Sequence, residues 1–116
     1  MYYRFITKAT MKEYNARKWY IDRDIIPEQE IEADTLPEAI EQWRQQIRDR
    51  YYIDISKNAI RNKSAMYIDT AAGTKQIGYV FTGKTDFQDD YYRWTSQYIE
   101  LWTEITTISA VDFLEV

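Results

Sequence analysis

Apolar and polar residues alternate at the beginning of the chain, and this alternation predicts a β-strand over residues 2–10. One side of this strand is formed by Tyr3, Phe5 and Thr7. A polar turn follows, and residues 17–24 then resume the alternation as a second strand.

Pro27 interrupts this second strand, because proline cannot donate a hydrogen bond to a central sheet ladder. Residues 29–33 regain β character after it. They are interpreted either as the second strand continuing beyond a bulge or as a short separate strand.

Thr35 begins the most clearly marked element, a helix. Thr35 and Glu38 have the spacing of a capping box, and Pro37 fits the first helical turn. Apolar residues then recur at helical spacing and form one stripe, made by Leu36, Ala39, Ile40, Trp43, Ile47 and Tyr51. A helix with one apolar stripe must pack on another apolar surface, and the sheet is the candidate.

The second half of the chain is rich in β-forming residues. Residues 52–63 are ambiguous between a loop, a short strand and a helical turn. The expected segments after them are strands at 65–69 and 76–82 joined by a turn, a loop at 84–90, and a long β run from 91 to 108.

Together these elements predict a single α+β domain spanning residues 1–116. Its order is β-β-α-β-β-β, with one helix packed on one face of an antiparallel sheet of about five strands. A chain of this length can bury a core without disulfide or metal staples.

Cysteine and histidine are both absent from the sequence. Their absence removes thiolate chemistry, the commonest general base and the commonest transition-metal ligand. We therefore expect a protein that is not an enzyme and that has no cofactor and no metal. No apolar run is long enough for a signal peptide or a membrane span, so we expect a cytoplasmic protein with no membrane contact.

Charge is unevenly distributed along the chain, whose net charge is −4. Residues 1–23 contain six basic and two acidic residues, whereas residues 86–116 contain seven acidic residues and one basic. Such asymmetry indicates charged partners, or two segments that pair as neighbouring strands and neutralise each other. The 11 Tyr and 4 Trp residues suit either sheet packing or a binding surface.

Residues 78–85, GYVFTGKT, match the phosphate-loop expression GxxxxGK[ST]. That loop requires flexible residues followed by a helix N-terminus, but here the middle residues are β-formers and the following segment is acidic. We therefore interpret the match as a coincidence.

An acidic and aromatic segment follows this motif. Three carboxylates there could hold a hard cation, but their spacing fits no EF-hand loop, and solvated carboxylates are the expectation. Contact with another protein, of unknown identity, is the favoured function, and its candidate residues are Asp86, Asp89, Asp90, Tyr91 and Tyr92.

An alternative function is binding of single-stranded nucleic acid. Arg17, Lys18, Trp19 and Tyr20 interleave cations with aromatic rings, as a stacking platform on a strand does. The net negative charge of the chain disfavours this alternative.

Three segments of the chain carry a resemblance. Residues 33–40, 76–87 and 97–105 resemble a pattern found in small accessory proteins of bacterial phages and integrative mobile elements. The resemblance covers about half of the chain and brings no catalytic residues. It implies an accessory protein that binds and inhibits a host factor, such as a defence nuclease.

Overall fold

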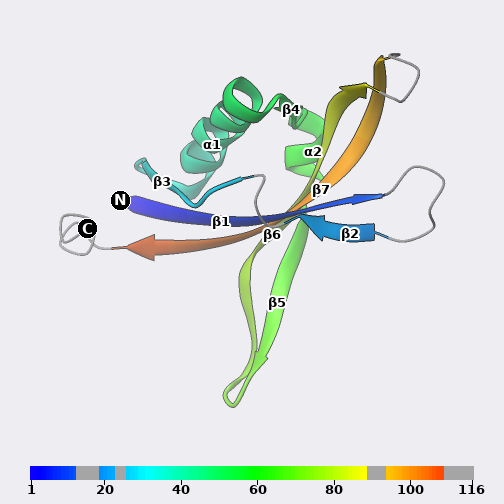
Figure 1. Ribbon diagram of the computed structural model, residues 1–116. Coiled ribbons are helices and arrows are strands. Elements are labelled where there is room, and N and C mark those ends of the chain that lie inside the picture. The colour runs from blue at the N-terminus through cyan, green and yellow to red at the C-terminus, as the bar shows by residue number, and fades with distance from the viewer. Residues whose placement is uncertain (13–18, 23–25, 89–93, 109–116) are drawn as a thin grey trace.

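The computed structural model describes residues 1–12, 19–22, 26–88 and 94–108 (Figure 1). Within these residues the chain forms seven strands and two helices. In chain order they are β1 (Tyr2–Lys12), β2 (Trp19–Asp22), β3 (Gln29–Glu32), α1 (Leu36–Tyr51), β4 (Ile53–Asp54), α2 (Lys57–Arg61), β5 (Ser64–Thr70), β6 (Gly73–Gln88) and β7 (Trp94–Ile108).

All pairs of neighbouring strands are antiparallel, and the path through the sheet is β2-β1-β7-β6-β4. Each of the long strands β1 and β6 pairs with two shorter strands, one after the other, along one edge. β1 pairs with β3 along its first residues and with β2 along its last, while β6 pairs with β5 and then with β4. β7 pairs with β1 on one edge and with β6 on the other, so it lies at the centre of the sheet.

The core lies between α1 and one face of this sheet. Trp43 of α1 is fully buried and stacks on Phe5 of β1, with ring centroids 5.4 Å apart and an interplanar angle of 13°. On its other side Trp43 contacts Phe81 of β6 at a centroid distance of 5.0 Å. These contacts join the helix to two strands that are far apart in the sequence and that β7 separates in the sheet.

The helix begins where the capping pattern predicts. The Thr35 hydroxyl accepts a hydrogen bond from the backbone N–H of Glu38 at 3.3 Å, and Pro37 occupies the first turn. The helix ends at Tyr52, whose backbone is left-handed (φ 58°) and whose N–H donates to the carbonyl of Arg48.

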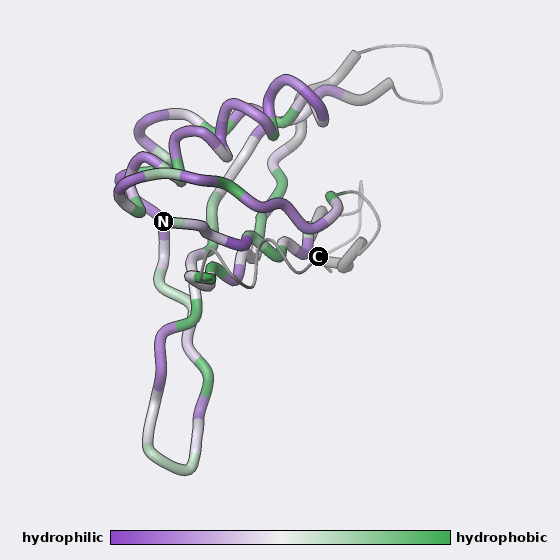
Figure 2. Tube along the Cα trace, turned by 90° about the vertical axis from the view of Figure 1, so that its left-hand side faces the viewer, coloured by the Kyte–Doolittle hydropathy of each residue, from purple (hydrophilic) through white to green (hydrophobic). Residues whose placement is uncertain are grey.

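The β5–β6 hairpin leaves the sheet on the side opposite α1 (Figure 1). Figure 2 shows it standing away from the rest of the described chain, with apolar and polar residues following one another along it. Every residue of β5 is exposed except Met66, which is half-buried. The turn ends on Gly73, whose φ of +114° is rarely adopted by residues with a side chain.

The predicted α+β architecture with an antiparallel sheet and one main helix is confirmed. Two open alternatives are resolved: residues 29–32 form a separate strand, and the ambiguous segment contains both β4 and the short α2. One prediction needs correction, because β6 continues to Gln88. The predicted loop at 84–90 was therefore wrong at residues 84–88. These residues pair with β7 through a regular register, which local loop-like composition does not reveal.

The two oppositely charged ends of the chain are neighbours in the sheet. β1 and β7 pair antiparallel from Tyr2↔Ile108 to Met11↔Ile99. The register brings the two segments side by side but places an uncharged residue directly opposite each charged one, as in Lys8↔Trp102 and Thr10↔Glu100.

Candidate protein-binding surface

β7 has two chemically different faces because its side chains alternate. Ile99, Leu101 and Thr103 are buried under α1, and the hydroxyl of Thr103 lies 3.2 Å from that of Thr7 on β1. The intervening residues lie on the other face. We call that second face of β1, β7 and β6 the outer face; on β7 it displays Tyr98, Glu100, Trp102 and Glu104.

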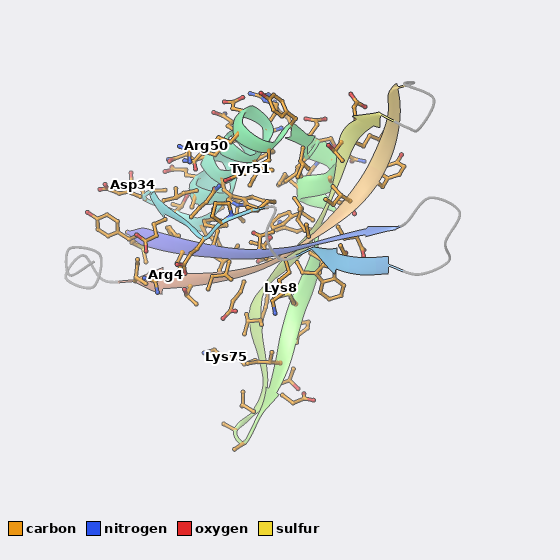
Figure 3. All side chains as sticks on the ribbon, in the orientation of Figure 1. Arg4, Lys8, Asp34, Arg50, Tyr51 and Lys75 are labelled. Atoms are coloured by element: carbon orange, nitrogen blue, oxygen red, sulfur yellow. The ribbon has the colours of Figure 1, made fainter. Side chains whose placement is uncertain are left out.

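Trp102 lies at the middle of the outer face. Its cross-strand neighbours are Lys8 on β1 and Val80 on β6. Ile6 precedes Lys8 on the same face, and both Ile6 and Trp102 are exposed, at 37% and 41%. Figure 3 shows Lys8 on the side of β1 that faces away from α1. An exposed tryptophan among aliphatic residues is typical of a contact surface.

A hydrogen bond orients the indole ring of Trp102. Its Nε1 donates to the hydroxyl of Thr10 on β1 at 3.1 Å, and that hydroxyl lies 3.4 Å from the backbone carbonyl of Glu100, to which it donates. The ring is therefore tied toward β1 and leaves space on its β6 side.

A cleft of about 310 Å³ occupies that space, between the outer face and the base of the β5–β6 hairpin. We call it the Trp102 cleft, and its lining consists of Ser64, Ala65, Met66, Tyr67, Val80, Glu100 and Trp102. Its volume is at the lower end of the range of small-molecule sites, about 300–1,000 Å³, so it suits one side chain of a partner.

The hairpin shifts its register at the edge of this cleft. Met66 pairs with Gly78, and the next residue, Tyr67, pairs with Gln76, so Ile77 is an extra residue on β6. Such a bulge bends and twists a strand. Tyr67, which is 59% exposed, thus lies where the hairpin turns away from the sheet.

On β7, two acidic side chains of the outer face lack ion-pair partners within the described chain. Glu100 and Glu104 form no salt bridge there, and their cross-strand neighbours Thr10 and Ile6 carry no charge. By contrast, Arg4 is bound by two carboxylates of the β3 segment at 3.1 and 3.3 Å.

The helix carries a second satisfied ion pair. Arg44 donates to both carboxylate oxygens of Glu41, at 2.6 and 2.9 Å, and to the backbone carbonyl of Ile55 at 3.0 Å. The hydrogen bonds from Arg44 lower the pKa of Glu41 below its ordinary value of 4.5. This pair attaches α1 to the segment after β4 and has a structural role.

Most of the candidate residues predicted from the sequence fall outside the described residues. Asp86 lies on β6, where it is exposed and pairs with Ser96, whereas Asp89, Asp90, Tyr91 and Tyr92 are not described. This predicted set therefore stays a prediction.

The alternative nucleic-acid site is described only in part. Trp19 and Tyr20 belong to β2, where they pair with Lys12 and Met11, while Arg17 and Lys18 lie outside the described residues. The stacking platform thus remains a prediction.

The phosphate-loop match lies entirely within strand β6, as its β-forming residues indicated. The structure explains the glycine at position 78, because a Cβ there would overlap the backbone carbonyl oxygen of Thr103 on β7. A continuous strand presents no loop of N–H groups that could surround a phosphate.

Trp102 and Glu100 were not singled out from the sequence, although a signal was present. In residues 98–105 the even positions are aromatic or acidic and the odd positions are apolar or Thr. This period of two indicates a strand with one buried and one exposed face. That the exposed face borders a hairpin and forms a cleft is not readable from the alternation.

The described residues contain no group of three or more acidic, His or Cys side chains placed to hold a metal ion. Neither described helix is long and apolar enough to cross a membrane. No protein-family model, curated protein sequence or solved structure matches this chain.

Proposed function

We propose that this protein is a non-catalytic binding module for another protein, which it contacts through the outer face and the β5–β6 hairpin. One observation carries the proposal. Seven large apolar side chains are exposed in the described chain, and five of them belong to these two elements: Ile6, Tyr67, Ile68, Tyr98 and Trp102. Concentration of exposed aromatic and aliphatic side chains on two neighbouring elements of a small domain favours a protein contact.

The shape of the surface supports the same proposal. α1 covers the inner face of the sheet, so the outer face is the side available to a partner (Figure 1). The hairpin projects beside it and adds a second wall. A two-stranded ribbon alone is marginally stable in water, so a partner that packs against it would add stability.

The resemblance to accessory proteins of phages and mobile elements extends the proposal to inhibition of a host factor. The net charge of −4 fits a partner with a basic surface, such as a protein that acts on nucleic acid. Asp86 at the far part of β6, together with the undescribed residues after it, is part of the proposed contact.

Affinity capture from a bacterial lysate, with and without nuclease, tests the proposal. We expect one dominant protein that survives nuclease, is recovered severalfold less with Trp102→Ser or Tyr67→Ser, and is unchanged with Tyr52→Asn. Tyr52 is a matched control because it is 79% exposed at the C-terminal end of α1, outside both proposed elements, and Asn tolerates its left-handed backbone.

Two results would contradict the proposed function. The first is equal recovery of the captured protein by the Trp102 and Tyr52 variants. The second is recovery of nucleic acid and its associated proteins, lost on nuclease treatment, which would favour the single-stranded nucleic-acid alternative through Arg17, Lys18, Trp19 and Tyr20.

A further inference from the structure

The Trp102 cleft combines an aromatic ring, a carboxylate and aliphatic walls. Trp102 and Glu100 lie two residues apart on β7 and therefore project from the same face, while Val80 lies beside Trp102 on β6. Met66 of the hairpin also lines the cleft. These three chemistries in one cleft are the complement of a long cationic side chain.

The carboxylate of Glu100 is available for such a ligand. It is half-exposed, lines the cleft and forms no ion pair within the described chain. Its cross-strand neighbours on both sides are threonines, Thr10 and Thr82. By contrast, Glu30 and Glu41 already bind Arg4 and Arg44.

The ring of Trp102 is also available to a cationic ligand. The protein already places lysines over two tyrosines, with Lys63 Nζ 4.9 Å from the centre of the Tyr79 ring and Lys84 Nζ 5.0 Å from that of Tyr98. Among the described residues no cation lies over Trp102. Lys8, its neighbour on β1, is on the side opposite the cleft.

We propose that the Trp102 cleft receives an arginine side chain from a basic segment of the partner protein. Its guanidinium forms paired hydrogen bonds with the Glu100 carboxylate and stacks on the Trp102 ring, while its methylene groups contact Val80 and Met66. Arginine is favoured over lysine because its planar fork matches a carboxylate and an aromatic face together. This inference rests on the proposed function and specifies the chemistry of the partner.

Binding of short peptides to the intact protein tests the inference. The probes are hexa-arginine, hexa-lysine and a Gly-Ser peptide of equal length, followed through the tryptophan indole N–H resonances in ¹⁵N–¹H spectra. The Trp102 resonance is assigned as the one lost in Trp102→Phe. We expect hexa-arginine to shift this resonance, hexa-lysine to bind several-fold more weakly and the Gly-Ser peptide to leave it unchanged.

A pair of charge-matched variants separates the cleft from general attraction to an acidic protein. Glu100→Gln should weaken hexa-arginine binding by about tenfold, since one charge-assisted hydrogen-bonding group is lost. Glu32→Gln removes the same charge from an exposed position on β3, which lies on the other edge of β1, and should change binding less than twofold. An unchanged Trp43 resonance shows that each variant keeps its core.

Equal weakening by Glu100→Gln and Glu32→Gln, or equal binding of hexa-arginine and hexa-lysine, would overturn the inference. The capture experiment keeps this failure distinct from failure of the proposed function. A partner lost with Trp102→Ser but retained with Glu100→Gln would leave the protein-binding function standing and remove the arginine site. A partner lost with both variants supports the arginine site.

Discussion

The indole Nε1 of Trp102 donates a hydrogen bond to the hydroxyl of Thr10 at 3.1 Å, between β7 and β1. Thr10 is buried, so its hydroxyl is held in place, and it also donates to the backbone carbonyl of Glu100. One hydroxyl thus orients the exposed ring and contacts the strand that carries the acidic side chain. The open space beside Val80 follows from this orientation.

Replacing Thr10 by Val should release the ring without changing the shape of the side chain. We expect a stability loss of about 1 kcal/mol, measured by denaturant unfolding, because one hydrogen-bonding group between β1 and β7 is lost. Exchange of the Trp102 indole N–H with solvent should accelerate, since its acceptor is gone. Thr10→Ser keeps the hydroxyl and is the control. Slow exchange in the valine variant would show that the hydrogen bond does not hold the ring.

Alanine at Gly78 should destabilise the sheet strongly. The added Cβ would overlap the backbone carbonyl oxygen of Thr103, and backbone at the centre of a sheet cannot move aside as a side chain can. We expect a loss of about 3 kcal/mol or more in the free energy of unfolding. Gly73→Ala is the comparison, because its Cβ would meet open space and only its positive φ is unfavourable, which costs about 1 kcal/mol. Equal losses in the two variants would contradict the close approach of β6 and β7.

Gln29 has a buried side-chain amide, 6% exposed, whose nitrogen and oxygen form no hydrogen bond with the described residues. A buried polar group without partners costs free energy, so Gln29→Met, which keeps the length of the side chain, should raise stability by about 1 kcal/mol. Thermal and denaturant unfolding measure the change. Gln29→Glu should have the opposite sign, because it buries a carboxyl at the same place. Destabilisation by methionine would indicate that the amide has a partner in solution.

The ion pair of Glu41 and Arg44 predicts a small pH dependence of stability. Arg44 lowers the pKa of Glu41 in the folded state, so the pair contributes stability that is fully present above the ordinary value of 4.5. This contribution is lost as the pH falls through the lower pKa of the folded protein. Because the Glu41 side chain is 45% exposed, we expect only about 0.3–0.5 kcal/mol.

Glu41→Gln tests this dependence. The variant should be less stable than the natural protein at neutral pH and should approach it in acid, measured by urea unfolding at several pH values. A constant difference across the pH range would show that the hydrogen bonds, and not the charge of Glu41, make the contribution.

Local sequence patterns predicted the elements whose residues have strong conformational preferences of their own. The helix at Leu36–Tyr51 follows from the Thr35 cap and the apolar stripe that contains Trp43. The strand at Tyr2–Lys12 follows from its alternation. The pattern failed at residues 84–88 and left α2 undecided between a loop and a helical turn. In both segments the composition resembles a loop, and pairing or packing with β6 decides the conformation.

The candidate site likewise has features that the sequence predicts and features that depend on the tertiary structure. The sequence by itself determined that β7 has a buried and an exposed face, because side chains alternate on any strand, and that the chain contains neither histidine nor cysteine. Only the tertiary structure decided that Trp102 leans toward Thr10 and that the β5–β6 hairpin faces the space this leaves. The physical reason is that a cleft is made by register and strand direction, and these depend on pairing between residues far apart in the chain.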